Sequence, residues 1–265
     1  MAGYVCTIAG GKGGVGKTTT AVNVGAGLQE LGYDVAVVDA DLGMANLGSM
    51  LEVEPQKSVH EILAGNAAVS EALTDAPGGL TVIAGEQSLD AFADADPAKL
   101  RKVIKTLRAA YDVVIIDTGA GLSHEVAVPL GLADGIVLVT TPDEVAVGDT
   151  VKTAQLANRI DGNVIGGIIN RVTRHTDVAE INDRLDFPLL AVIPDDPQAT
   201  HEEPLIRNEP DSPAADAFLQ LTDALEGVFF EDTTAGADLD TIVDQSWFVD
   251  DESEEESGGV FGLFN

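Results

Sequence analysis

Short runs of apolar residues alternate along the chain with longer segments whose apolar residues recur at helical spacing. The apolar runs predict seven strands, at residues 4–9, 34–40, 80–85, 112–117, 135–141, 163–170 and 188–194. The longer segments predict helices at residues 17–32, 96–111, 143–160 and 212–227. Continuous apolar strands separated by helices indicate an α/β fold with a mostly parallel sheet and helices on both of its faces.

The segment between the first strand and the first helix fits the pattern G-x-x-x-x-G-K-[ST], with Gly11, Gly16, Lys17 and Thr18 in register. Glycines let the backbone wrap closely around a polyphosphate, so that N–H groups and the helix N-terminus point at its negative charge. In such a loop Lys17 reaches the β- and γ-phosphates, and the Thr18 hydroxyl is a ligand of Mg²⁺. The predicted phosphate-binding residues are Gly11, Lys12, Gly13, Gly14, Val15, Gly16, Lys17, Thr18 and Thr19.

Three carboxylates stand where predicted strands end. Asp39 and Asp41 follow the second strand, and Asp117 ends the fourth. Ligands of such sheets bind beyond the carboxyl ends of the strands, and a carboxylate there can hold Mg²⁺, usually through water. Asp117 is our predicted Walker B acid, and Gly119 and Gly121 after it would let the loop respond to a γ-phosphate. In so acidic a chain, the alternative for each acid is a helix cap or a solvated side chain.

Net charge limits the classes of partner. The chain has 45 acidic and 14 basic residues, for a net charge of −31. This argues against broad electrostatic attraction to nucleic acid or anionic lipid at ordinary salt. The acidity also suits a halophile. In its cytoplasm, concentrated salt would screen surface charges, and the net charge would then indicate little about partners. There is no charged-then-apolar leader and no apolar run near 18 residues, so we expect a cytoplasmic protein.

Three motifs together resemble the MinD/ParA family of ATPases. "KGGVGKTT", beginning at Lys12, resembles its deviant Walker A loop, and "DADLGMANL" and "DTGAG" resemble its two switch segments. The resemblance covers residues 3 to about 195. It implies a P-loop NTPase fold, ATP and Mg²⁺ as cofactors, and a homodimer when ATP is bound. In that dimer Lys12 would cross the interface to the phosphates held by the other subunit.

The same resemblance implies further roles. Asp41 would position or activate the attacking water, and Asp39 would support the magnesium site. The implied catalytic residues are Lys12, Lys17 and Asp41, and the metal residues are Thr18, Asp39 and Asp117. Asn170, Arg171, Pro194 and Asp195 match the places where the family holds adenine.

The motifs favour the MinD branch, because partition ATPases usually carry Pro-Gln after the second acid. Gly119 departs from the proline of typical MinD proteins, and "DTGAG" resembles ATPases that control flagellar number and position. The implied function is slow, dimerisation-coupled ATP hydrolysis that positions a division site or a polar motility or chemosensory assembly. A ParA-like DNA-partition ATPase is the alternative, and an amide ligase of the same fold also stays open. A nitrogenase-reductase relative is excluded, because Cys6 is the only cysteine.

The chain divides into an ATPase domain at 1–227 and an acidic tail at 228–265, which we expect to be disordered because it holds eleven acids and no lysine or arginine. Its apolar residues could contact a protein partner or, weakly, a membrane; alternatively they fold back on the domain. One set is a helical stripe, Leu239, Ile242, Val243 and Trp247. The other is the C-terminal motif, Val260, Phe261, Leu263 and Phe264.

Five of the 14 basic residues lie on the single predicted helix 96–111: Lys99, Arg101, Lys102, Lys105 and Arg108. They form either a solvated face or a docking site for an acidic partner or for the protein's own tail. This helix is also the only segment that could supply the basic surface of a DNA-partition ATPase.

Overall fold

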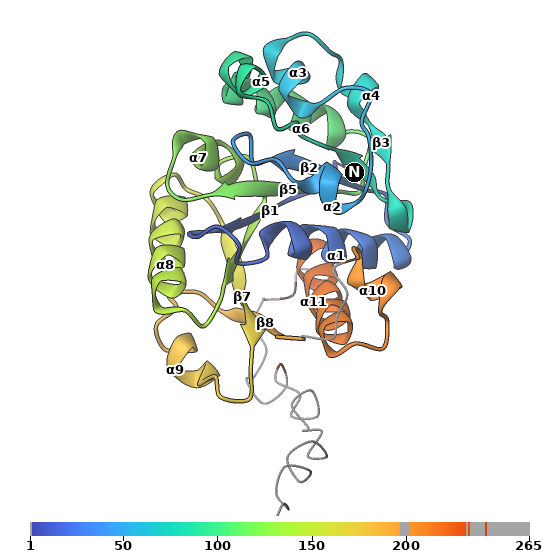
Figure 1. Ribbon diagram of the computed structural model, residues 1–265. Coiled ribbons are helices and arrows are strands. Elements are labelled where there is room, and N and C mark those ends of the chain that lie inside the picture. The colour runs from blue at the N-terminus through green and yellow to red at the C-terminus, as the bar shows by residue number, and fades with distance from the viewer. Residues whose placement is uncertain (1, 197–201, 232, 234–241, 243–265) are drawn as a thin grey trace, which may run out of the picture.

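The computed structural model describes residues 2–196, 202–231, 233 and 242, and is built on one eight-stranded sheet (Figure 1). The strands are β1 Tyr4–Gly10, β2 Val35–Ala40, β3 Thr74–Asp75, β4 Thr81–Ile83, β5 Val113–Ala120, β6 Gly135–Thr140, β7 Val164–Val172 and β8 Leu189–Pro194. Their order is β3-β4-β2-β5-β1-β6-β7-β8, and only the β3–β4 pair is antiparallel. The predicted mostly parallel α/β sheet is confirmed.

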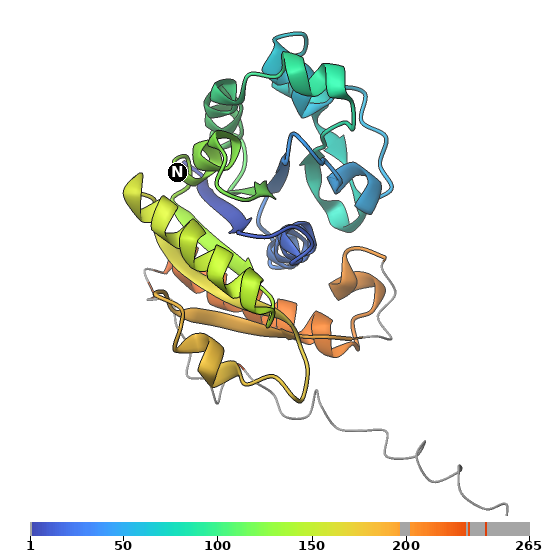
Figure 2. The ribbon, with the colours of Figure 1, turned by 60° about the vertical axis from the view of Figure 1, so that its left-hand side comes forward.

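Helices cover both faces of the sheet. On one face lie α1 Lys17–Glu30, α10 Leu205–Asn208 and α11 Pro213–Phe230, which Figure 1 shows grouped together. The opposite face carries α3 Val59–Ala64, α6 Leu100–Leu107, α7 His124–Leu130, α8 Glu144–Arg159 and α9 Val178–Asn182. In Figure 2, α8 lies in front of the strands and α11 behind them. Shorter helices at the carboxyl edge or the β3 end are α2 Leu47–Met50, α4 Val69–Ala72 and α5 Leu89–Asp94.

The alternation of side chains along each strand explains the two layers. In β1, Cys6 and Ile8 pack under α1 and α11, whereas Val5 and Ala9 pack toward the helices of the other face. All six residues of β2 and of β6 are buried, as expected for parallel strands covered on both sides. The carboxyl ends of these strands meet at one edge, where the loops after β1, β2 and β5 lie together.

Two predicted helices have different ends in the structure. The predicted helix 96–111 is a short 3₁₀ turn, Pro97–Lys99, followed by α6, which ends at Leu107. Residues 108–110 form a turn after it, and the Ala110 and Tyr111 N–H groups both donate to the Leu107 carbonyl. The predicted helix 212–227 instead continues to Phe230 as α11. Aromatic stacking explains the extension, because Phe229 stacks on Tyr4 at 4.2 Å and Phe230 on Tyr33 at 4.4 Å.

Little of the predicted tail lies in the described part of the chain. Beyond α11, Ile242 is described and is buried against the outer core of β7 and β8. The other residues of the predicted stripe, and the whole C-terminal motif, lie outside the described residues. Within the described part of the chain, no helix is both long enough and apolar enough to cross a membrane.

Candidate functional site

Residues 11–16 form a loop between β1 and α1 at the carboxyl edge of the sheet. Gly14 and Gly16 have positive φ values of 74° and 100°, a conformation that favours glycine. Helix α1 begins at Lys17, and none of the described side chains caps it. Its first N–H groups are therefore available to an anion that enters the loop, as the glycine pattern predicted.

Asn170 supports the loop from β7. Its side chain is buried and donates from Nδ2 to the Val15 carbonyl at 2.9 Å, while its Oδ1 accepts from the Arg171 N–H at 2.9 Å. A Cβ on Gly16 would overlap this amide, so glycine at that position and Asn170 depend on each other. Asn170 thus connects β7 to the glycine-rich loop, a contact that the sequence did not indicate.

Lys17 lies inside the loop with only 7% of its surface exposed. Its Nζ is 3.4 Å from the Lys12 carbonyl oxygen. Burial lowers the pKa of the ammonium, and the nearby carboxylates of Asp117 and Asp41 oppose that effect. The Lys12 carbonyl and the carboxylates of Asp117 and Asp41 therefore keep the Lys17 ammonium inside the loop.

Lys12 points elsewhere. Its ammonium forms an ion pair with Asp143 at 2.9 Å, and both side chains are about half exposed, at 43% and 50%. The same Oδ1 of Asp143 accepts the Ala146 N–H at 3.0 Å, so Asp143 is also the N-cap of α8. Lys12 and Lys17 are neighbours in the motif, but in the single chain only Lys17 faces the interior of the loop.

Asp39 organises the loop after β2. Its buried carboxylate accepts backbone N–H groups from Asp41 at 3.1 Å and from Asn46 and Leu47 at 3.2 Å each. Burial raises the pKa of Asp39, and these backbone donors oppose the rise. Because its oxygens already accept three N–H groups, this acid shapes the loop that carries Asp41.

Asp117 is fully buried in the carboxyl-terminal half of β5, which continues to Ala120, and neither of its carboxylate oxygens has a hydrogen-bond partner among the described residues. Burial raises its pKa first, followed by the nearby charge of Asp39, whereas Thr18 and Lys17 lower it. The Thr18 hydroxyl lies in the same place and donates to Asn46 Oδ1 at 3.0 Å. A buried carboxylate without donors beside a hydroxyl fits a hydrated Mg²⁺.

The described residues hold no cluster of three acidic, histidine or cysteine side chains that could bind a metal unaided. A cation at Thr18 and Asp117 would therefore take its remaining ligands from water and from a phosphate. Such partial coordination by protein is usual for Mg²⁺ at phosphate sites.

The two loops that carry acids touch each other. Asp41 accepts the Met44 N–H at 3.0 Å, and its carboxylate lies against Gly119, where an added Cβ would come within 3.1 Å of Oδ1. The glycine that departs from the pattern of typical MinD proteins thus leaves room for the acid of the other loop.

The four predicted adenine residues lie at the ends of the adjacent strands β7 and β8. Pro194 is paired with Val172, and the Asp195 N–H donates to the Val172 carbonyl at 2.8 Å. Arg171 is exposed, with a φ of 58°, and Asp195 is exposed as well. Asn170 is the member of this set that reaches the phosphate loop.

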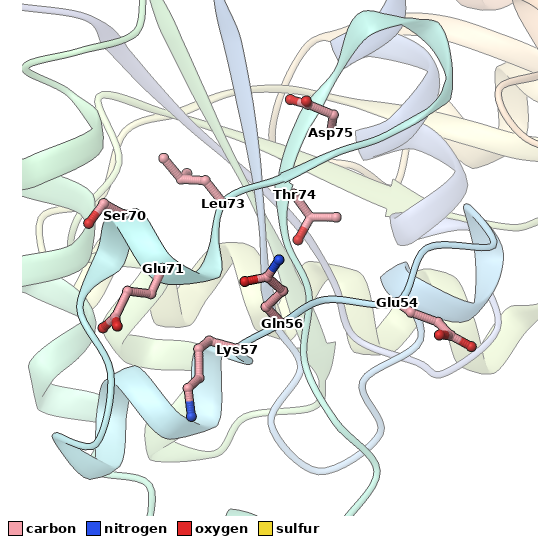
Figure 3. A pocket seen from close by; sticks show the side chains of 8 residues that line it. All are labelled: Glu54, Gln56, Lys57, Ser70, Glu71, Leu73, Thr74 and Asp75. Carbon is pink, nitrogen blue, oxygen red and sulfur yellow. The ribbon is translucent and has the colours of Figure 1, made fainter.

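A polar hollow of about 420 Å³ lies at the other end of the sheet (Figure 3). It is lined by residues of the 54–57 segment, α4 and β3: Glu54, Gln56, Lys57, Ser70, Glu71, Leu73, Thr74 and Asp75. None of the predicted site residues lines this hollow, and the chemistry described above belongs to the P-loop edge.

The buried acids predict a pH dependence of stability without metal. Asp39 and Asp117 keep their protons to higher pH in the folded chain than in the unfolded chain. Their contribution is therefore complete below about pH 4 and is lost as the pH rises through about 8. We expect the Tm of the metal-free protein to fall over this range by several degrees, since 1 kcal/mol moves Tm by about 2–4 °C in a chain of this size.

Asp117→Asn is the matched variant, because it removes the titrating group without changing the shape of the side chain. In thermal unfolding followed by circular dichroism, its Tm should depend less on pH. Equal pH dependence of Tm in both proteins would contradict the assignment of this pH dependence to Asp117.

Comparison with known proteins gives a consistent picture. Residues 3–163 match the family model described as "AAA domain". The septum site-determining protein MinD of Synechocystis is 32% identical over 238 residues, covering 84% of this chain and 89% of that protein. The antiactivator FleN of Pseudomonas aeruginosa is 31% identical over 161 residues, or 60% of this chain and 58% of FleN.

A solved structure of MinD from Pyrococcus horikoshii, complexed with Mg-ADP, is similar with a TM-score of 0.81 and 32% identity. The match covers 87% of this chain and 98% of that one. Family model, sequence relatives and fold agree with the three motifs and their order. The chain belongs to the MinD/ParA family of deviant Walker A P-loop ATPases.

Proposed function

We propose that this chain binds Mg-ATP, dimerises through the ATP-bound face and hydrolyses ATP slowly, and that this cycle positions a cellular assembly. The observation that carries the proposal is the placement of the two lysines. Lys17 is buried in its own loop, whereas Lys12 is half exposed at the rim, and among the described residues its ammonium is paired only with the exposed carboxylate of Asp143. A cation in that place is free to serve a second subunit.

The residues of one subunit have separate tasks. The loop N–H groups and Lys17 bind the phosphates, and Asn170 keeps the loop in shape. Thr18 and Asp117 hold Mg²⁺, which neutralises charge on the β- and γ-phosphates. Asp41 orients the attacking water, and Asp39 fixes the loop that carries Asp41. Arg171, Pro194 and Asp195 form the edge against which adenine lies.

The carboxyl edge of the sheet also has the apolar surface that a dimer would bury. Met44, Leu89, Leu122 and Val145 follow β2, β4, β5 and β6 and are 78%, 87%, 53% and 58% exposed. Met44 and Leu122 lie on loops, and Leu89 and Val145 lie in the first turns of α5 and α8, all at the edge that carries the P-loop. Large exposed apolar side chains gathered on one face are typical of interaction surfaces. They support association face to face across the nucleotides, with Lys12 at the rim of the contact.

Asp143 should restrain Lys12 before dimerisation. Asp143→Asn keeps an N-cap for α8 but removes the charge that holds the ammonium. An exposed ion pair contributes about 0.2–1 kcal/mol, and a dimer contains two such pairs, so we expect ATP-dependent dimerisation to strengthen by up to about 30-fold. Sedimentation velocity over a range of protein concentrations measures this. Weaker dimerisation in Asp143→Asn would show that the pair does not compete with the dimer.

At the level of the cell, the positioned assembly is a division site or a polar motility or chemosensory complex, recognised through a protein partner. The likeness to MinD and FleN supports this choice. A ParA-like partition ATPase is the second candidate, and the observation that favours it is the row of exposed cations on α6.

Localisation tests this function directly. A fluorescent fusion of the wild-type chain in its native host should gather at a pole, at mid-cell or in discrete foci. The Lys17→Ala fusion should be evenly distributed, because positioning requires bound nucleotide. Identical distributions of the two fusions would contradict the spatial role, and co-localisation with the nucleoid would favour the partition ATPase.

A further inference from the structure

Four cations on α6 and the turn before it form a surface that stands out in this acidic chain. Helix α6 buries Leu100, Val103, Ile104 and Leu107 against the sheet. Its outer side exposes Lys99, Arg101, Lys102 and Lys105, which we call the α6 basic surface.

The α6 basic surface makes no ion pair with the described residues, although acids outnumber bases by 45 to 14. At least six of the ten lysines and arginines outside this surface are ion-paired: Lys12, Lys57, Arg108, Lys152, Arg184 and Arg207. Four adjacent cations without a carboxylate are therefore available to an acidic segment from outside the described structure.

The chain contains such a segment close to an anchored residue. Residues 250–256 hold six acids and no base. Eight positions before them, Ile242 is only 6% exposed and packs against α8, α9 and the strands β7 and β8. These contacts place Ile242 on the face of the sheet that also carries α6.

The distances allow the two to meet. Eight residues span up to about 26 Å when extended, and the fourteen from Ile242 to Glu256 span up to about 46 Å. The strands under Ile242 and under α6, β7 and β5, are three positions apart in the sheet, which is about 14 Å at the usual spacing. The remaining length is enough to pass over α8 and α7.

We infer that the acidic run 250–256 docks in the same chain on the α6 basic surface, with Ile242 as its anchor. The anchor makes the contact intramolecular, so that individually weak charge pairs act at an effective concentration in the millimolar range. Docking covers the only dense group of exposed cations in the described structure and draws the C-terminal motif toward α6. A partner that binds the α6 basic surface must then displace the acidic run 250–256. A partner that binds the acidic run must likewise displace it from α6. The inference stands apart from the proposed ATPase function.

Fluorescence transfer within one chain tests this contact. Thr106 is exposed beside Lys105 on α6, and Ser253 lies in the middle of the acidic run, so Thr106→Cys and Ser253→Cys carry the two dyes. The native Cys6 is fully buried and should not react. At one fixed salt concentration, Lys102→Glu/Lys105→Glu should lose the charge-dependent part of the transfer. The transfer efficiency of this variant should equal that of a second variant, in which the six acids of residues 250–256 are replaced by Asn and Gln.

Adding Glu254→Lys/Glu255→Lys to the α6 reversal should restore the transfer, which a misfolded helix would not allow. Lys57→Glu/Arg207→Glu is the control for net charge, because it makes the same change in charge at cations outside the α6 basic surface and should leave the transfer intact. Both cations are ion-paired in the folded chain, so circular dichroism checks that this variant stays folded. Equal transfer in all variants would overturn the inference. Transfer that appears only between differently labelled molecules would place the tail on a second copy and would overturn it as well.

Discussion

Lys17→Ala should lose most of its affinity for Mg-ATP. Lys17 is the one lysine of the described site that is buried inside the loop, with its Nζ beside the Lys12 carbonyl and near Asp117. Removal of a desolvated charge contact typically costs about 2–5 kcal/mol. We therefore expect affinity for ATP to fall by roughly 30-fold to several thousand-fold. Isothermal titration calorimetry with Mg-ATP measures this directly.

Lys12→Ala is the matched control for this experiment. Both variants remove one positive charge from the same loop, but Lys12 is paired with Asp143 at the rim. ATP binding by the monomer should therefore fall little in Lys12→Ala. The measurements are best made in high salt, which favours the fold of so acidic a chain. Undiminished ATP affinity in Lys17→Ala would refute the assignment of the site.

The parts of the fold that could be predicted are those whose signal lies within a few residues. Each of the seven strands other than β3 appears in the sequence as a mostly apolar run, because its residues are largely buried. β3 has two residues and pairs only at the edge, so it leaves no pattern. Helices α2 and α4 have four residues each, little more than one turn, so their apolar residues cannot repeat at helical spacing and give no recognisable pattern.

The candidate site divides in the same way. The P-loop and the acids at the ends of β2 and β5 follow from local motifs together with the parallel order of the strands. The contacts between Asn170 and Val15, which are 155 positions apart, and between Lys12 and Asp143, 131 positions apart, follow from neither. Such pairs depend on which strands become neighbours, and strand order is a property of the whole chain. The sequence also did not decide whether Ile242 packs on its own domain or on another protein, because an apolar stripe does not show what covers it.

Lys12→Ala should chiefly remove the ATP-dependent dimer. If Lys12 were only a loop residue, its loss would weaken ATP binding slightly and leave association unchanged. If instead it reaches the phosphates of a second subunit, its loss leaves charge in the interface without its partner. A contact of that kind contributes about 2–5 kcal/mol, or roughly 30-fold to several thousand-fold in dimer affinity.

The experiment needs ATP to persist while the dimer is measured. Asp41→Ala supplies that background, because Asp41 is proposed to act on water and should leave ATP bound, block most turnover and let dimer accumulate. In this background, light scattering or sedimentation with Mg-ATP should show dimer when Lys12 is present and monomer when it is alanine. Asp143→Asn provides the contrast, since it frees Lys12 instead of removing it and should favour the dimer. An equal fraction of dimer with and without Lys12 would refute the proposal that Lys12 acts in a second subunit. Lys12 would then be an ordinary loop residue that pairs with Asp143.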